Sequence, residues 1–118
     1  MDLEDLRDQV RAFATQRDWQ QFHTPKNLAM ALAGEVGELL AEMQWLTPEQ
    51  SSTVMRSDVG EQVRAEIGDV MIYLVRLADV LDIDLVAAAR EKLADSALRY
   101  PADQVRGSAD KARRPDGS

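Results

Sequence analysis

The sequence predicts an all-α protein. Helix-favouring residues (Ala, Leu, Glu, Gln and Arg) dominate its 118 positions, and no segment reads convincingly as a strand. Apolar residues instead recur every three or four positions through four long segments. The four prolines stand where helices would begin, where the chain would turn, or in the tail. We therefore expect a four-helix bundle formed by one helical domain, residues 1–101, followed by a polar tail, residues 102–118.

The first helix is expected from Asp2 to Arg17, with an acidic first turn that complements the helix dipole. Residues 18–23 then form a loop that is rich in large rings. We interpret Phe22 in this loop as a core side chain, and His23 as a loop residue or a hydrogen-bonding residue at the start of the next helix. For Trp19, a core position and a position against a nucleotide base fit about equally.

The second helix is expected from Pro25 to Leu46, with Thr24 as its N-cap. Its buried face should be an apolar stripe made of Leu28, Leu32, Leu39, Met43 and Leu46. Glu35 lies in the middle of this stripe, and Glu38 borders it. A carboxylate in such a place is costly unless a positive group meets it, and no Lys or Arg occurs from residue 27 to residue 55. This predicts a bound cation.

A short helical turn is expected at Thr47–Gln50, followed by a polar connector. The third helix should begin after a cap at Ser57 or Asp58 and end near Leu81. Its stripe is Val63, Ile67, Val70, Leu74, Leu77 and Leu81, with Glu66 and Tyr73 on the flank and Asp69 further round. Met71, Ile72 and Val75 lie outside the stripe, which indicates a subunit interface in addition to the core.

The fourth helix should be capped by Asp84 and run to about Leu98. It is ended by Arg99-Tyr100-Pro101, because the residue before a proline avoids the helical region. The polar and locally basic tail is expected to be partly disordered when nothing is bound.

Composition excludes several classes of function. The chain has no cysteine and one histidine, so disulfides, thiolate metal sites and most nucleophilic triads are excluded; the lack of cysteine also fits a cytoplasmic protein. A net charge of −7 disfavours nucleic-acid polymers as partners. No signal-peptide pattern and no run of membrane-spanning length is present, so no membrane partner is expected.

Two acidic pairs at i, i+3 spacing remain, Glu35 with Glu38 and Glu66 with Asp69. Facing each other from two helices, they would form an all-oxygen site, which suits Mg²⁺, with Mn²⁺ as a substitute. The alternative is that both pairs lie on solvated helix faces. Carboxylate-bound Mg²⁺ typically serves phosphate chemistry.

Aromatic and basic side chains near these pairs could meet a nucleotide. A base can stack on rings such as those of Trp19, Trp45 and Tyr73, although a core role fits Trp45 about as well. Phosphates could meet basic residues such as Lys92 and Arg99, although for each of them taken alone a solvated surface charge is the better interpretation.

These motifs resemble those of a known family. The resemblance rests on the segments Arg17-Asp18-Trp19, Gln21-Phe22-His23, Gly34-Glu35-Val36-Gly37-Glu38-Leu39, Gln44-Trp45, Glu66-Ile67-Gly68-Asp69-Val70 and Arg99-Tyr100-Pro101. These segments are similar to those of the MazG-like nucleoside triphosphate pyrophosphohydrolases, and most of all to those of the dCTP pyrophosphatase branch. The similarity covers nearly the whole chain.

The resemblance implies Mg²⁺ ligation by Glu35, Glu38, Glu66 and Asp69. It also implies substrate contacts from Trp19, Trp45 and Tyr73, with His23 nearby, and assembly as a homodimer or a dimer of dimers (homotetramer). Two positions differ from the branch's usual pattern. Val10 replaces a histidine near the base pocket, which bears on cytosine preference, and Ser96 replaces an asparagine of the fourth helix.

The sequence therefore predicts a Mg²⁺-dependent enzyme that hydrolyses a nucleoside triphosphate, such as the pyrimidine dCTP, to the monophosphate and pyrophosphate. Glu35 and Glu38 are the candidates for activating water, and the role would be to clear excess or non-canonical nucleotides. The alternatives are a non-enzymatic acidic helical interaction module and, with less support, a di-metal oxidase.

Overall fold

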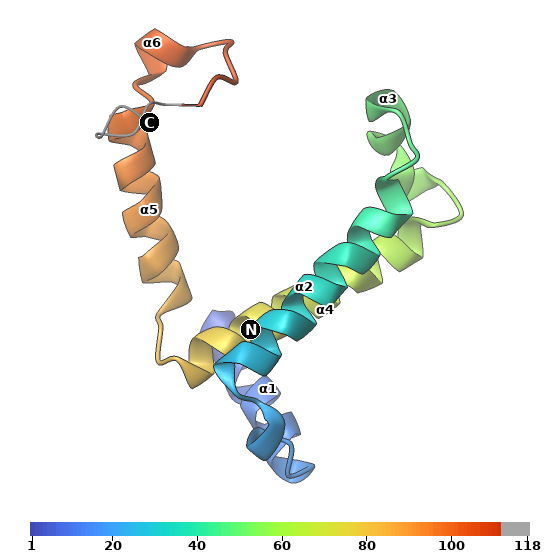
Figure 1. Cartoon of the computed structure of the whole chain (residues 1–118), viewed down its shortest axis with the longest axis vertical. Helices are drawn as coiled ribbons and strands as arrows, with labels where there is room; N and C mark the ends of the chain where they lie inside the picture. Colours follow the sequence, from blue (N-terminus) through green and yellow to red (C-terminus); the bar gives the residue numbers. More distant parts are fainter. Residues whose placement is uncertain (112–118) are drawn as a thin grey trace. The chain divides into compact units, whose positions relative to one another are not determined.

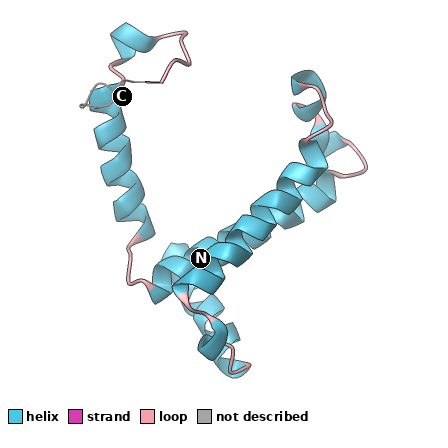
Figure 2. Cartoon of the chain, in the orientation of Figure 1, coloured by secondary structure: helices cyan, strands magenta, loops and turns pink. Residues whose placement is uncertain are grey.

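The computed structural model describes residues 1–111, which form only helices and the turns between them (Figure 2). In chain order the elements are α1 (Leu3–Gln16), the 3₁₀ turn η1 (Gln20–Phe22), α2 (Pro25–Met43), α3 (Pro48–Ser51), the 3₁₀ turn η2 (Val54–Arg56), α4 (Gly60–Val80), α5 (Leu85–Arg99) and α6 (Ala102–Val105) (Figure 1). No strand occurs among these residues, so the all-α prediction is confirmed. The four long helices predicted correspond to α1, α2, α4 and α5.

The chain divides into two compact units, Met1–Ile83 and a second unit from Asp84 onward. In the first unit α2 and α4 run side by side in opposite directions, and α1 and η2 pack on α4 (Figure 1). The second unit contains α5 and α6. The four-helix bundle and the domain boundary at residue 101 stay predictions. The predicted disorder at residues 112–118 lies outside the described residues.

Most of the predicted helix starts are present. The Thr24 hydroxyl accepts a hydrogen bond from the Asn27 backbone N–H at 3.2 Å, and the Asp84 carboxylate accepts one from the Ala87 N–H at 3.0 Å. The predicted cap of the third helix is wrong. Helix α4 begins at Gly60 with no side-chain cap, because the η2 turn precedes it and brings the Met55 carbonyl against Gly60, where a Cβ would lie 2.7 Å from that oxygen.

Two helices end in the same six-residue turn without a glycine. Asp18, after α1, and Asp82, after α4, both have positive φ, at 55° and 56°. After each, the next residue returns a hydrogen bond to the helix: Trp19 N–H to the Ala14 carbonyl at 2.9 Å, and Ile83 N–H to the Ala78 carbonyl at 2.8 Å. The first of these turns places Trp19 against the end of α1.

The predicted buried face of α2 is confirmed. Leu28 is fully buried, its partners on the stripe are half-buried, and Glu35 lies half-buried among them. The helix ends at Met43, three residues before the predicted end, because residues 44–46 form a turn.

The predicted stripe of α4 is partly wrong. Val63 is buried and Val70 and Leu77 are half-buried, but Ile67, Leu74 and Leu81 are exposed. Helix α2 packs on the side of α4 that carries Val63 and Glu66, so the buried face is rotated toward the acidic flank. An exposed apolar strip that includes Ile67, Met71 and Leu74 is left uncovered in the single chain.

No helix within residues 1–111 combines the length and the apolar character that a membrane span requires.

Candidate metal centre

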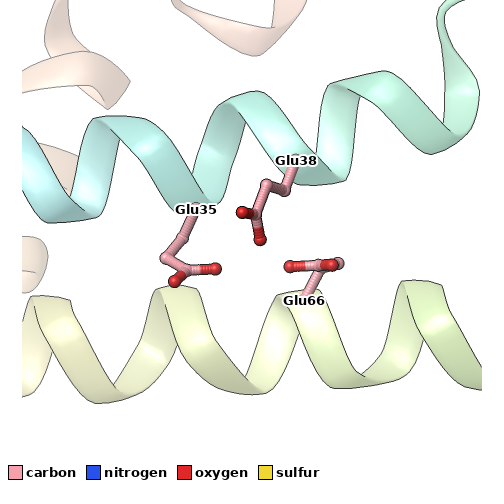
Figure 3. A group of neighbouring side chains, drawn as sticks. All are labelled: Glu35, Glu38 and Glu66. Carbon is pink, nitrogen blue, oxygen red and sulfur yellow. The ribbon is translucent and has the colours of Figure 1, made fainter.

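The carboxylates of Glu35, Glu38 and Glu66 meet between α2 and α4. Each offers an oxygen that lies within 4.8 Å of the others' oxygens. Figure 3 shows Glu35 and Glu38 extending from α2 toward Glu66, which extends from α4. One turn of helix separates Glu35 from Glu38, so the antiparallel neighbour presents Glu66 to both of them.

The cluster has buried oxygen atoms without hydrogen-bond partners. Glu66 is only 5% exposed, and its Oε1 accepts a hydrogen bond from the Gln62 side-chain amide at 2.5 Å. Its Oε2 is buried without a partner, and so is Oε2 of Glu35. A buried carboxylate oxygen without a donor is costly, so these two atoms call for a ligand that the chain does not supply.

Electrostatics in the cluster favour a cation. Burial, followed by hydrogen bonding to Glu38 and the negative charges of Glu38, Asp69 and Glu66, together raise the pKa of Glu35 to about 7. Glu35 and the three charged groups that raise its pKa are all acidic, so they repel one another when ionised. A divalent cation bound to their oxygens would replace this repulsion with attraction.

Asp69 lies near the cluster but does not join it. Its charge reaches Glu35, yet the side chain is exposed, and it is absent from the group whose oxygens lie within 4.8 Å of one another. On α4, Asp69 follows Glu66 by one turn but lies about 60° round the helix from it, where its side chain is exposed. Ligation by Asp69 therefore stays a prediction.

The predicted ring side chains differ widely in their surroundings. Trp45 is 87% exposed, which contradicts a core position in the single chain, and Tyr73 is half-buried. The Trp19 ring meets Phe13 edge-on with the ring centroids 5.6 Å apart. Phe22 is 59% exposed, so the prediction that it is core is wrong: the η1 turn is tied to α2 by the Asn27 side chain donating to the Phe22 carbonyl at 3.0 Å, not by burial of the ring.

Comparisons with known proteins agree with this geometry. Residues 23–102 match the family model "MazG nucleotide pyrophosphohydrolase domain". This segment contains both acidic pairs and covers more than half of the chain. The chain belongs to the MazG nucleotide pyrophosphohydrolase domain family. The resemblance found in the motifs is thereby confirmed.

Similar proteins include dCTP pyrophosphatase 1 of Homo sapiens, which is 44% identical over an aligned length of 114 residues, with 92% of this chain and 65% of that protein covered. The Rattus norvegicus protein of the same name is 43% identical over 91% of this chain and 64% of its own length. The chain therefore spans slightly less than two thirds of these relatives. Among solved structures, a pyrophosphatase from Archaeoglobus fulgidus DSM 4304 superposes with a TM-score of 0.78, at 40% identity, over 83% of this chain and 91% of that one.

The remaining predicted substrate residues, Lys92 and Arg99, belong to α5 in the second unit. Both are near the Asp95 carboxylate, at 3.9 Å and 4.0 Å between nitrogen and oxygen. These are exposed contacts within one helix, which contribute little to stability. A role in phosphate binding stays a prediction for both.

Sequence reasoning missed two groups of residues in this family member. Gln62, which holds Glu66, precedes it by four residues on the same helix, so helical spacing alone was a usable signal. The second group connects His23 to Arg76, whose side chain donates to His23 Nδ1 at 3.0 Å, and through Arg76 to Asp79. Only the i, i+3 spacing of Arg76 and Asp79 was visible in the sequence.

Proposed function

We propose that the protein is a Mg²⁺-dependent nucleoside triphosphate pyrophosphohydrolase. Water would attack the α-phosphorus, the α–β phosphoanhydride bond would break, and pyrophosphate would leave, so the products are a nucleoside monophosphate, pyrophosphate and a proton. The observation that carries this proposal is the cluster of Glu35, Glu38 and Glu66 with two buried, unpartnered oxygens, in a chain of this family.

The residues present suit a hard divalent cation. The donor set is made only of carboxylate oxygens, which Mg²⁺ prefers, and Mn²⁺ accepts the same ligands. Glu35, Glu38 and Glu66 would hold the ion, with Asp69 as a further ligand. When bound, it supplies charge neutralisation at the phosphate oxygens. Glu35 and Glu38 are the candidates for orienting and deprotonating water.

For the substrate we propose a pyrimidine deoxynucleotide such as dCTP. The support is the 43–44% identity to proteins called dCTP pyrophosphatase 1. The exposed ring of Trp45 and the partly exposed rings of Trp19 and Tyr73 would stack on or flank the base, with His23 nearby. Lys92 and Arg99 would meet the phosphates.

A second copy of this chain is the proposed partner, in a homodimer or homotetramer. The support is the exposed apolar strip of α4 that includes Ile67, Met71 and Leu74, since helix faces of this kind are normally covered. Light scattering during size-exclusion chromatography measures the mass directly. A monomer at micromolar concentration would contradict this part of the proposal. The expected cytoplasmic location stays a prediction.

The bond that breaks decides the reaction. A panel of canonical and modified triphosphates is incubated with Mg²⁺ in ¹⁸O-labelled water, and the products are analysed by ³¹P NMR and mass spectrometry. We expect pyrophosphate, with the heavy oxygen in the monophosphate, and the fastest turnover with dCTP. The exposed Glu49→Gln variant should behave like the native protein. Orthophosphate with a diphosphate, or heavy oxygen in pyrophosphate, would contradict the mechanism.

A further inference from the structure

A chain of alternating charges links α1 and α4 to the loop before α2. Arg76 of α4 is 7% exposed and donates from Nε to His23 Nδ1 at 3.0 Å and from Nη1 to the Asp79 carboxylate at 3.1 Å. The same carboxylate accepts a hydrogen bond from Nε of Arg11 at 2.9 Å. Asp79 is therefore held by two guanidinium groups, and Arg76 is held between Asp79 and His23.

The contact with Arg76 determines where His23 carries its hydrogen. A guanidinium has only donors and keeps its charge at any ordinary pH. Nδ1 of His23 must therefore present its lone pair to Arg76. A neutral imidazole has one donor and one acceptor nitrogen, so its hydrogen lies on Nε2. In the imidazolium form both nitrogens carry hydrogens, and the Nδ1 hydrogen would point at the positive Arg76.

The charged groups around His23 agree with a neutral ring. Burial, followed by the charge of Arg76, lowers the pKa of His23 below its ordinary value. On α4, Arg76 contacts the ring and Asp79 contacts Arg76, and on α1 Arg11 contacts Asp79. The half-buried ring retains exposed surface.

Asp79 is needed because Arg76 is buried. A buried guanidinium without a carboxylate would be strongly unfavourable, and it would lose the orientation that directs Nε at the imidazole. The attachment of Arg11 from another helix lowers the pKa of Asp79, so this carboxylate stays ionised at neutral pH. His23 is thus connected to two helices through charged groups and not by packing alone.

We propose that Arg76 and Asp79 are positioning residues, which hold His23 as the neutral imidazole with its hydrogen on Nε2, so that His23 offers the nucleotide one N–H donor and no charge. This use of His23 rests on the proposed function. The recognised chemistry is a hydrogen-bond acceptor of the nucleotide, either a base oxygen or nitrogen, or a phosphate oxygen. A histidine without this contact would exchange between its two tautomers and would gain charge near its ordinary pKa.

The tautomer can be measured in the native protein, without any substitution. Because the chain has one histidine, its ring signals assign themselves in a long-range ¹H–¹⁵N correlation spectrum of the ¹⁵N-labelled chain. We expect the pattern of the neutral Nε2–H form at pH 7, with protonation of the ring only below the ordinary histidine pKa. A ring protonated on Nδ1, an imidazolium, or an equal mixture of tautomers at pH 7 would overturn the proposal.

Variants then test the cause. Arg76→Met keeps an unbranched apolar side chain and removes the donors, so His23 should become a mixture of tautomers with a higher pKa. Asp79→Asn should move the spectrum in the same direction, and the tautomer of the native protein decides the proposal if either variant does not fold. Arg64→Met, at an exposed arginine of the same helix, is the control and should leave the ring signals unchanged. An unchanged tautomer in both network variants would overturn the proposal.

Two further readouts connect the tautomer to the nucleotide. Arg76→Met should raise KM for dCTP about tenfold with a smaller change in kcat, since one hydrogen bond to the substrate is weakened. It should also introduce the ionisation of His23 into the pH profile of kcat/KM. Adding dCMP or pyrophosphate separately, each with Mg²⁺, shows which one shifts the Nε2–H signal, and so whether the acceptor is on the base or on a phosphate.

The two proposals fail separately. If the native chain hydrolyses no triphosphate but shows the Nε2–H form, the proposed function fails. If it hydrolyses dCTP while His23 shows another tautomer, or if neither dCMP nor pyrophosphate shifts the signal, the inference about Arg76 and Asp79 fails.

Discussion

Helix α4 contributes to two groups of charged side chains that are built in opposite ways. The carboxylate cluster (Glu35, Glu38 and Glu66) brings together like charges and leaves two buried oxygens without partners. The charged network (Arg11, Asp79, Arg76 and His23) alternates in sign from Arg11 through Asp79 to Arg76 and ends at the His23 ring, and each member contacts the next. Both lie in the first unit, Met1–Ile83.

The difference in charge pairing between the carboxylate cluster and the charged network indicates the function of each. A buried group whose charges are satisfied within the chain needs nothing further, and its removal should cost stability. A buried group of like charges raises the free energy of the folded chain until a cation arrives. The pKa values agree: that of Glu35 is raised to about 7, while that of Asp79 is lowered. Unsatisfied charge therefore distinguishes the candidate site from the structural network.

The largest expected effect on stability comes from the network. Asp79→Asn keeps the shape of the side chain but leaves Arg76 buried without its carboxylate, so the free energy of unfolding should fall by about 3–5 kcal/mol. Urea unfolding monitored by tryptophan fluorescence measures the change. Asp95→Asn removes an exposed carboxylate that also faces two basic groups, and it should cost less than about 1 kcal/mol. Equal losses of unfolding free energy in Asp79→Asn and Asp95→Asn would show that the network stabilises the fold no more than an exposed ion pair does.

The matching change in the cluster should act on activity instead. Glu66→Gln removes one of the like charges, so the metal-free protein should be as stable as the native protein or slightly more stable. Its turnover should fall more than about 100-fold, because even groups that only orient metal ligands typically contribute about 10–100-fold. A metal-free variant destabilised as strongly as Asp79→Asn would remove the distinction between the two groups.

Gln62 tests how far the cluster extends along α4. Gln62→Ala removes the amide that holds Glu66 Oε1, so turnover should fall about 10-fold with little change in stability. Gln9→Ala, at an exposed position of α1, is the control. Unchanged turnover with Gln62→Ala would confine the site to the carboxylates themselves.

The smallest effect should appear in the pH dependence of stability without metal. Because the pKa of Glu35 is raised from 4.5 to about 7 on folding, the folded state binds more protons in this range, and stability should decrease as the pH rises from about 4.5 to 7. The pKa of Asp79 is lowered from 3.8, so its contribution is lost as the pH falls below that value.

Urea midpoints measured from pH 3 to pH 8 with a chelator should show both slopes. Glu35→Gln should remove only the slope above about pH 4.5, and Asp79→Asn only the slope at acidic pH. A Glu35→Gln variant that keeps the upper slope would assign that proton to another group.

Helical periodicity was sufficient to predict the cluster. It placed Glu35 on the stripe that α2 buries, and the absence of nearby basic residues marked its charge as unsatisfied. It also gave a second helix with Glu66 on its flank. Periodicity gives a direction around the helix but not a depth, which is why Asp69 was grouped with Glu66 although only Glu66 is buried.

The network was not predictable in the same way. Its contacts join residues 53 and 68 positions apart, and no local pattern in the sequence determines which of several arginines reaches His23 or Asp79. The prediction that Phe22 is buried was wrong for a related reason. Ring size suggests burial, but a three-residue turn is buried only where another element covers it, and in this chain Phe22 is exposed.

The central claim is that the carboxylate cluster is a cation site. The most direct test is thermal melting across a Mg²⁺ titration at fixed ionic strength, which holds general screening constant. A cation that binds only the folded cluster raises the melting temperature with concentration. We expect this rise in the native protein, in Glu49→Gln and in Arg11→Met, which alters only the network, and a loss of most of it in Glu66→Gln. An unaltered Mg²⁺ response in Glu66→Gln would show that Glu66 is not a ligand and would contradict the proposed site.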